Sequence, residues 1–326
     1  LNTTPDALRV HGLLAEYVQQ QAQAVAMEVS SHALEQGRVN AVQFDVALLT
    51  NLSRDHLDYH GDMSSYAAAK RRLFDWQSLK YAVLNLDDAF GSELAEQLQD
   101  AEVEAIGYGL TDQALQQAER LGMRMVFGGK LNLDARGFIL HIHSSWGGGE
   151  LRSGLLGKFN AANMLGTLAV LLVSGVALQD ALRELAQLQA VSGRMQTLGG
   201  GAQPAVVVDY AHTPDALEKV LLALREVSEA TGGKLICVFG CGGDRDRGKR
   251  PMMGQVVARL ADVSIVTSDN PRSEKPHDII AAIVPGIEAG LAGKACGYQV
   301  VEDRAEAIAL AIGEAQAKDT VLLAGK

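Results

Sequence analysis

Cysteine is scarce in this 326-residue chain, which holds three: Cys237, Cys241 and Cys296. None of them belongs to a CxxC pair. A disulfide framework or a cysteine zinc site would need more thiols at closer spacing. The sparse, odd set therefore indicates a reduced, cytoplasmic protein.

Long apolar runs are also missing. A transmembrane helix needs about 18 consecutive apolar residues, and the most apolar stretch, residues 164–172, is too short. The first residues, Leu1 to Pro5, lack the layout of a signal peptide. The net charge of −10 argues against a surface that coats nucleic acid. We therefore expect neither a membrane nor a nucleic-acid partner.

Both ends of the chain have unusual features. The sequence starts without Met and stops at Gly325-Lys326, where a predicted strand passes into a loop. We expect it to be a piece of a longer protein, and its length suggests about two domains.

The first half alternates helix-like and strand-like patterns. Helices are predicted over 5–23, 64–74 and 160–174, and strands over 24–28, 44–50 and 81–85. Such alternation is typical of an α/β fold with a parallel sheet. Residues 124–156 differ, because short apolar runs alternate there with glycine-rich turns. That pattern predicts a small antiparallel section.

The second half predicts a Rossmann-like domain. Strands are expected over 205–209, 234–240, 263–267, 297–301 and 320–324, with helix-like segments between them. Ser192-Gly193-Arg194 resembles a hinge, so the predicted domains are 1–193 and 194–326. Ligands of such sheets bind at the carboxyl ends of the strands. Polar residues gather at those ends, above all in Asp269-Asn270-Pro271-Arg272, where a surface turn would not explain the arginine.

Two histidines in Asn51–Gly61 suggest a metal. His56 and His60 are four residues apart and would share a helix face, as zinc pairs do, but the HExxH pattern is absent. Oxygen-bearing side chains dominate this segment, which suits Mg²⁺ better. Glu28 ends an apolar run, where a carboxylate needs a partner. For His60 we favour a hydrogen-bonding role.

Two basic segments are candidate binding elements. Lys70 follows three alanines on a predicted helix, and a lysine in a tight site can change its charge state. The glycine-rich loop that starts at Gly240 lies between strand and helix, but GxxxxGK[ST] occurs nowhere in the chain. Arg245 in this loop favours bidentate recognition of a carboxylate.

These segments together resemble the Mur ligases, over nearly the whole chain. The segments that carry the resemblance are 2–4, 28–38, 51–61, 69–70, 156–163, 192–194, 209–214, 240–247 and 269–272. The resemblance implies an N-terminal nucleotide-gripping domain, a central ATPase domain and a C-terminal Rossmann-like domain. This chain would hold most of the second and nearly all of the third. The phosphate loop would lie upstream, so this piece alone should not turn over ATP.

The branch of the family that the segments most resemble adds meso-diaminopimelate to UDP-N-acetylmuramoyl-L-alanyl-D-glutamate during cytoplasmic peptidoglycan synthesis. ATP, held with Mg²⁺, would activate the D-glutamate γ-carboxylate as an acyl phosphate. The partners implied are these small molecules only, with the enzyme a monomer.

The resemblance also implies roles for individual residues. The muramoyl dipeptide would be held by Asn2, Thr3, Thr4, Ser30, Gln36 and Arg38. Mg²⁺ would be held by Glu28, His56 and Lys70, the last as a carbamate. ATP would be contacted by Asn160, Asn163, Arg194, Asp209 and His212, and diaminopimelate by Arg245, Asp269, Asn270, Pro271, Arg272 and Gly325.

Other functions stay open. A lysine-adding ligase of the same family differs at the 269–272 motif, and folylpolyglutamate synthetase shares the architecture without that motif. A zinc hydrolase could use His56 and His60. A non-catalytic nucleotide-binding module is disfavoured, because charged groups at strand ends cost stability unless they are used.

Overall fold

The computed structural model describes residues 3–134, 137–291 and 297–325. It divides into two compact units, each described by itself. The first comprises the chain up to Gly129 with His143–Gly148 and Leu165–Leu178, and the second comprises Lys130–Ile142, Gly149–Met164 and the chain from Gln179 onward. Asn2 and Cys296, both named above, lie outside the described residues. In the described part, no helix combines the length and apolarity that crossing a membrane requires.

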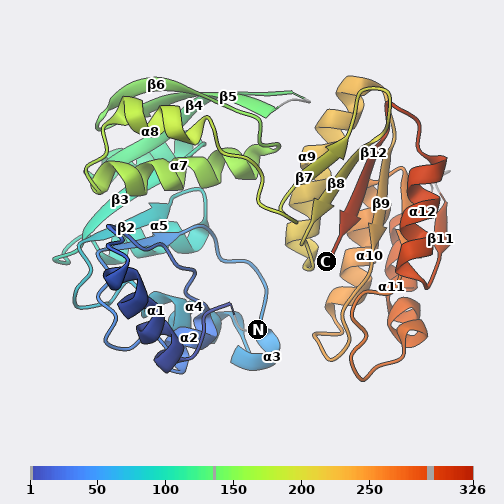
Figure 1. The fold of residues 1–326 in the computed structure, drawn as a ribbon, viewed down its shortest axis with the longest axis horizontal. Coiled ribbons are helices and arrows are strands. Elements are labelled where there is room, and N and C mark those ends of the chain that lie inside the picture. The colour runs from blue at the N-terminus through green and yellow to red at the C-terminus, as the bar shows by residue number, and fades with distance from the viewer. Residues whose placement is uncertain (1–2, 135–136, 292–296, 326) are drawn as a thin grey trace. The chain divides into compact units, whose positions relative to one another are not determined.

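Two six-stranded sheets form the framework (Figure 1). The first has the order β1-β2-β3-β4-β5-β6. Its strands are β1 (Val46–Leu49), β2 (Tyr81–Asn85), β3 (Glu104–Gly109), β4 (Arg124–Asp134), β5 (Gly137–Ser144) and β6 (Gly147–Ser153). β1 to β4 pair in parallel, and the two-residue connection between β5 and β6 requires those strands to run antiparallel. The predicted mixture of parallel and antiparallel strands is confirmed.

In the part of the chain that the structure describes, eight helices accompany the first sheet in the sequence: α1 (Ala7–Gln19), α2 (Ser31–Glu35), α3 (Leu57–His60), α4 (Met63–Arg71), α5 (Ala89–Gln97), α6 (Asp112–Arg120), α7 (Lys158–Val173) and α8 (Leu178–Leu185). Most of their starts have a side-chain cap; Asp88, for example, accepts hydrogen bonds from two backbone N–H groups of α5. Apolar residues of α5 and α6 pack with β1 and β2 in one buried cluster.

The predicted strand over 24–28 is wrong. Residues 24–28 adopt no strand, and Val25 and Glu28 are exposed. The run is apolar enough for a strand, but no described strand pairs with it. Without a ladder partner, its backbone groups are left to water or other contacts.

The second sheet has the order β11-β10-β9-β12-β8-β7. Its strands are β7 (Gln196–Gly199), β8 (Ala205–Asp209), β9 (Leu235–Phe239), β10 (Val263–Val266), β11 (Tyr298–Val300) and β12 (Thr320–Ala324). All pairs are parallel except β7 with β8. The five predicted strands are confirmed to within about a residue or two at their ends, while β7 was not foreseen.

Side-chain alternation buries both faces of this sheet. Cys237 and Phe239 of β9 pack into a core with α9 (Pro214–Thr231), α10 (Lys249–Leu260) and α11 (Pro276–Leu291). Ile236 and Val238 face the other way, into a cluster with α12 (Arg304–Glu314). Helices on both faces of a parallel sheet are the doubly wound arrangement.

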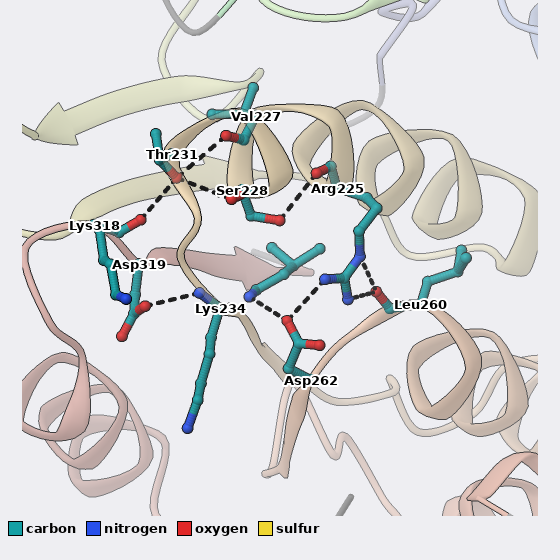
Figure 2. A network of polar contacts seen from close by, with 10 residues as sticks. Arg225, Val227, Ser228, Thr231, Lys234, Leu260, Asp262, Lys318 and Asp319 are labelled. Atoms are coloured by element: carbon teal, nitrogen blue, oxygen red, sulfur yellow. Dashed lines mark hydrogen bonds and ion pairs between the residues drawn. The ribbon is translucent and has the colours of Figure 1, made fainter. Parts of the chain in front are cut away.

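A polar network closes the amino ends of the central strands (Figure 2). Arg225 Nη1 donates to Asp262 Oδ2 at 2.8 Å, and the same oxygen accepts the backbone N–H of Leu235 at 2.7 Å. Asp319 accepts the N–H groups of Lys234 and Gln316 at 2.7 and 2.8 Å. These carboxylates join the starts of β9, β10 and β12, away from the edge expected to bind ligands.

We predict that Asp319→Ala lowers the free energy of unfolding by about 1–3 kcal/mol, because two backbone donors lose their acceptor. Urea denaturation with an unchanged m value measures this. The exposed Glu226, replaced by Ala, should change stability by less than about 0.5 kcal/mol. Equal effects of the two substitutions would contradict the role given to Asp319.

Candidate functional site

Thr4 fastens the start of the chain to the segment that precedes α2. Its side chain is fully buried. Thr4 Oγ1 donates to the carbonyl of Glu28 at 2.9 Å and accepts the backbone N–H of Ser30 at 2.9 Å. Ser30 Oγ in turn accepts the N–H of Ala33 and caps α2. Thr4 and Ser30, two of the residues predicted to hold the dipeptide, are therefore brought together.

Arg38 and Gln36 extend this cluster. Arg38 Nη1 donates to the carbonyl of Thr4 at 2.9 Å, and its Nε donates to Gln36 Oε1 at 2.8 Å. Gln36 Nε2 reaches the hydroxyl of Tyr59 in α3 at 3.0 Å. Thr3 is exposed beside Thr4. Four of the six residues predicted to hold the dipeptide thus form one connected group.

Lys70, near the end of α4, lies among carboxylates. Burial lowers the pKa of its ammonium, and the charges of Glu28, Asp55 and Asp88 oppose that shift. Its Nζ lies 5.2 Å from the centre of the Tyr66 ring. A buried lysine with a lowered pKa has a larger fraction of neutral, nucleophilic amine.

Glu28 reaches this position from an unexpected environment. It was predicted to end a buried strand, but it is exposed and its segment is not a strand. Its charge nevertheless acts on Lys70. Glu28 therefore acts on Lys70 from a segment without regular secondary structure, not from the end of a strand.

His56 occupies a strained position at the start of α3. Its φ is +55°, a left-handed conformation that costs a non-glycine residue about 1–2 kcal/mol. Its Nε2 lies 3.5 Å from Asp55 Oδ2, and its ring centroid lies 4.9 Å from that of His32. Backbone strain of this kind is common where a side chain is aimed at a ligand.

His60 is engaged at both ring nitrogens. Nδ1 lies 3.1 Å from Glu35 Oε2, Nε2 lies 2.9 Å from Ser31 Oγ, and only 1% of the side chain is exposed. The prediction of a hydrogen-bonding role for His60 is confirmed. Within the described residues no group of three or more His, Cys, Asp and Glu side chains is arranged to hold a metal. Because Glu35 and Ser31 engage both ring nitrogens of His60, the zinc-pair interpretation is not supported.

A second group of predicted residues lies at the carboxyl edge of the second sheet. Asp209 ends β8 and is 7% exposed. Its two oxygens accept the N–H groups of Met195 and Ala211 at 2.9 and 2.8 Å. Burial raises its pKa, and these hydrogen bonds oppose the shift. Asp209 thus shapes the segment around Arg194, whose guanidinium stacks 5.0 Å from the Tyr210 ring centre.

The other residues predicted to contact ATP are placed as follows. His212 lies near Tyr210, with its Nδ1 3.0 Å from that residue's carbonyl oxygen. Asn160 Nδ2 donates to the carbonyl of Leu156 at 2.8 Å, near the start of α7. Asn163 is exposed on the same helix.

Two loops meet at this edge, residues 240–248 after β9 and 267–274 after β10. The N–H of Gly243 donates to the carbonyl of Asn270 at 2.9 Å. Arg272 Nη1 donates back to the carbonyl of Gly243 at 2.7 Å. A Cβ at Gly243 would lie 1.9 Å from the carbonyl oxygen of Pro271, so only glycine allows this approach.

Gly325 and Asp269 also come together. A Cβ built on Gly325 would lie 3.8 Å from Asp269 Oδ2 and 3.8 Å from Arg304 Nη2. The N–H of Gly325 donates to the carbonyl of Asp209 at 3.1 Å. Arg245 and Arg272 are both exposed on the two loops. The residues predicted to bind diaminopimelate are thus gathered at the carboxyl edge of one sheet.

Several neighbours of these groups were not foreseen. Asp55 and Asp88 act on Lys70, and both follow adjacent parallel strands of the first sheet, a signal that the pattern offered. Arg304 reaches the carbonyl of Ala324 at 2.8 Å from the start of α12. Arg250 and Glu274 pair beneath the two loops. No motif in the sequence distinguishes that pair from ordinary surface charges.

Comparison with known proteins covers the whole chain. Residues 1–171 match the Mur ligase middle domain, and residues 193–326 match the Mur ligase glutamate ligase domain. The chain is 50% identical over 325 residues to the UDP-N-acetylmuramoyl-L-alanyl-D-glutamate–2,6-diaminopimelate ligase of Chromobacterium violaceum, covering 100% of this chain and 62% of that protein. It is 53% identical to the enzyme of that name from Pseudomonas aeruginosa, covering 100% of this chain and 63% of the relative.

A solved structure of a ligase with the same name shares 40% identity and a TM-score of 0.66. That match covers 99% of this chain and 63% of the solved one. The chain therefore spans about five-eighths of the length of the relatives it matches.

His60→Phe tests the hydrogen-bonding role. The ring keeps its stacking on Tyr66 but leaves buried Ser31 and half-exposed Glu35 without their partner. We expect a loss of about 1–3 kcal/mol in the free energy of unfolding, measured by urea denaturation. Metal analysis of the unsubstituted protein is the control: zinc bound one to one after dialysis would refute the assignment.

Proposed function

Because the chain belongs to the Mur ligase family, we propose that the protein containing it is the ATP-dependent ligase that adds meso-diaminopimelate to UDP-N-acetylmuramoyl-L-alanyl-D-glutamate. Relatives about half identical over all of this chain carry that name. The single observation that carries the substrate assignment is the pair of loops at the carboxyl edge of the second sheet. Together with Gly325, which follows β12, they bring Asp269 and Arg272 to one place.

The proposed reaction has two steps. A carboxylate is a poor electrophile, so a γ-carboxylate oxygen of D-glutamate first attacks the γ-phosphorus of ATP, which forms the acyl phosphate, breaks the bond to the β-phosphate and releases ADP. The free amine of diaminopimelate then attacks the acyl carbon, the amide C–N bond forms, and the C–O bond to phosphate breaks. The amine loses a proton and inorganic phosphate leaves. Negative charge accumulates throughout, so cationic groups must neutralise it.

Residues of the first unit would bind the nucleotide-linked dipeptide. Thr4, Ser30, Gln36 and Arg38 already form a hydrogen-bonded group, which supports a shared role together with exposed Thr3. Asn160, Asn163, Arg194, Asp209 and His212 would contact ATP. For Asp209, two backbone hydrogen bonds favour a positioning role, holding the segment that carries Arg194.

The chemistry of the groups around Lys70 supports Mg²⁺ as the ion. Three carboxylates act on this lysine, and hard oxygen donors are the ligands Mg²⁺ prefers. Glu28, His56 and Lys70 would hold the ion, with Lys70 as its carbamate. When bound, Mg²⁺ supplies positive charge against the phosphate oxygens.

The environment of Lys70 supports the proposal that it is carbamylated. A neutral amine can attack the carbon of CO₂, forming an N–C bond and releasing one proton. Burial lowers the pKa of Lys70 and so favours the neutral amine. The product is an anion, which turns a cation beside Glu28 and Asp55 into a further oxygen donor. An arginine could not undergo this change.

Arg272 would select the substrate. Diaminopimelate differs from lysine by a carboxylate at its far end, and a guanidinium suits a free carboxylate. Arg272 is exposed at the end of its loop, with Arg245 on the facing loop. Asn270 and Pro271 shape the corner between Asp269 and Arg272.

The remaining proposals concern organisation. We infer domains 1–193 and 194–326, with a hinge at residues 192–194. The enzyme would act as a monomer on small molecules in the cytoplasm, where ATP and nucleotide-linked precursors are available. Neither nucleic acid nor membrane is needed for the reaction.

Substrate choice can be measured with the complete protein that carries this chain. With ATP and the UDP-linked dipeptide as the other substrates, kcat/KM should be on the order of a hundredfold higher for diaminopimelate than for lysine. The reason is that lysine lacks the distal carboxylate that Arg272 would bind. Equal kcat/KM values for the two amino acids would refute the proposed specificity.

The second prediction concerns Lys70. Lys70→Ala should lower kcat by about a hundredfold or more, since a charge-stabilising group is lost. Lys70→Arg should not restore activity, because its charge is fixed. Short carboxylic acids added to Lys70→Ala should restore part of it. Full activity of Lys70→Arg would show that no carbamate is required.

A further inference from the structure

The ion pair between Arg250 and Glu274 lies beneath the two loops of the second unit. Arg250, the second residue of α10, is 3% exposed, and the Glu274 side chain is 13% exposed. The guanidinium donates to both carboxylate oxygens, at 2.7 Å to Oε1 and 3.0 Å to Oε2. This bidentate geometry is directional as well as attractive.

Glu274, in the 267–274 loop, contacts the 240–248 loop as well as Arg250 of α10. Its Oε1 also accepts the backbone N–H of Asp244, at 2.7 Å. Arg247 Nη2 approaches Oε2 at 3.1 Å from the exposed side. Hydrogen bonds from Arg250 and Asp244 lower the pKa of Glu274 to about 2, so the carboxylate is ionised throughout the working range of pH.

Asp244, in the 240–248 loop, also binds the 267–274 loop. Its carboxylate accepts the N–H of Ser273 at 3.1 Å and the hydroxyl of Ser273 at 2.6 Å. Asp244 and Arg272 both have positive φ, +53° and +51°. These are conformations that non-glycine residues rarely adopt, so the surrounding contacts must hold them.

The residue held in this way is Arg272. It stands between Pro271, against which Gly243 packs, and Ser273, which Asp244 binds. Arg250 and Glu274 lie below, and neither is among the residues assigned to the substrate. We propose, on the basis of the function inferred above, that the Arg250–Glu274 pair is a positioning device that fixes Arg272 for the distal carboxylate of the amino-acid substrate.

The Arg250–Glu274 pair affects the position of Arg272 and takes no part in the chemical step. A shift of about 1 Å in a binding group can cost as much as a hundredfold in rate. Losing the pair lets the Asp244–Ser273 connection relax and Arg272 move. Binding of diaminopimelate then weakens, while ATP and the dipeptide meet residues outside these loops.

The test is steady-state kinetics of the complete protein, with each KM measured separately. Glu274→Gln removes the anion, and Arg250→Lys keeps the buried charge but loses the bidentate fork. A double variant, Arg250→Met with Glu274→Leu, removes both charges and leaves no buried ion unpaired. Each should raise the KM for diaminopimelate about tenfold, leave the KM for ATP within about twofold, and reduce the preference over lysine.

Arg225 and Asp262 supply the matched control. They form another Arg–carboxylate pair in the same unit, at 2.8 Å, at the opposite edge of the sheet (Figure 2). Arg225→Lys and Asp262→Asn should lower the thermal midpoint without changing the KM for diaminopimelate selectively. A purely structural role for Arg250–Glu274 would give the same pattern as this control.

The outcomes separate the two proposals. Suppose that the unsubstituted protein prefers diaminopimelate and that the Arg250 and Glu274 variants have an unchanged KM for diaminopimelate. The proposed function then stands, while the positioning role is refuted. A parallel rise in every KM refutes it as well. If the unsubstituted protein shows no preference, the proposed function fails and the positioning role with it.

Discussion

The parallel pairing of β10, β9, β12 and β8 is the constraint on which the candidate site depends. Parallel strands must end at the same edge, so every loop that follows them begins there. Asp209, Asp269 and Gly325 are far apart in sequence, yet each lies at or within a few residues of the carboxyl end of one of these strands. The opposite edge serves stability, because Asp262 and Asp319 satisfy the backbone donors where β9 begins.

The charged groups around Lys70 differ in character from those around Arg272. Around Lys70, carboxylates approach a lysine whose pKa is lowered by burial, so the balance of charge can change with its protonation or modification. Around Arg272, by contrast, the Glu274 carboxylate stays ionised, because hydrogen bonds from Arg250 and Asp244 lower its pKa. Under the proposed function, the first group would act on phosphates and the second would hold a rigid template for recognition.

The sequence predicted the second sheet well, because runs such as Ala205–Asp209 and Thr320–Ala324 are β-branched or apolar and lie between helix signals. It failed at residues 24–28, where the apolar run looks the same but has no strand beside it. A pattern reports what a segment can do, not whether a partner is present. The sequence singled out the motif residues one by one as candidates. Asp55 and Asp88 could have been added to them, because both follow adjacent parallel strands of the first sheet. Arg250 and Glu274 could not, since each acquires its role only through contacts with another element.

The position of β12 has a consequence for synthesis of the protein. Among the described strands of the second sheet it comes last in chain order, but it lies between β9 and β8 in the sheet (Figure 1). Those two strands cannot pair through it until residues 320–324 have left the ribosome, more than a hundred residues after β8. At about 5–20 residues per second, the nascent domain spends several seconds or more with β8 and β9 edges open to other chains. A rare pause in translation before Thr320 would prolong that exposure.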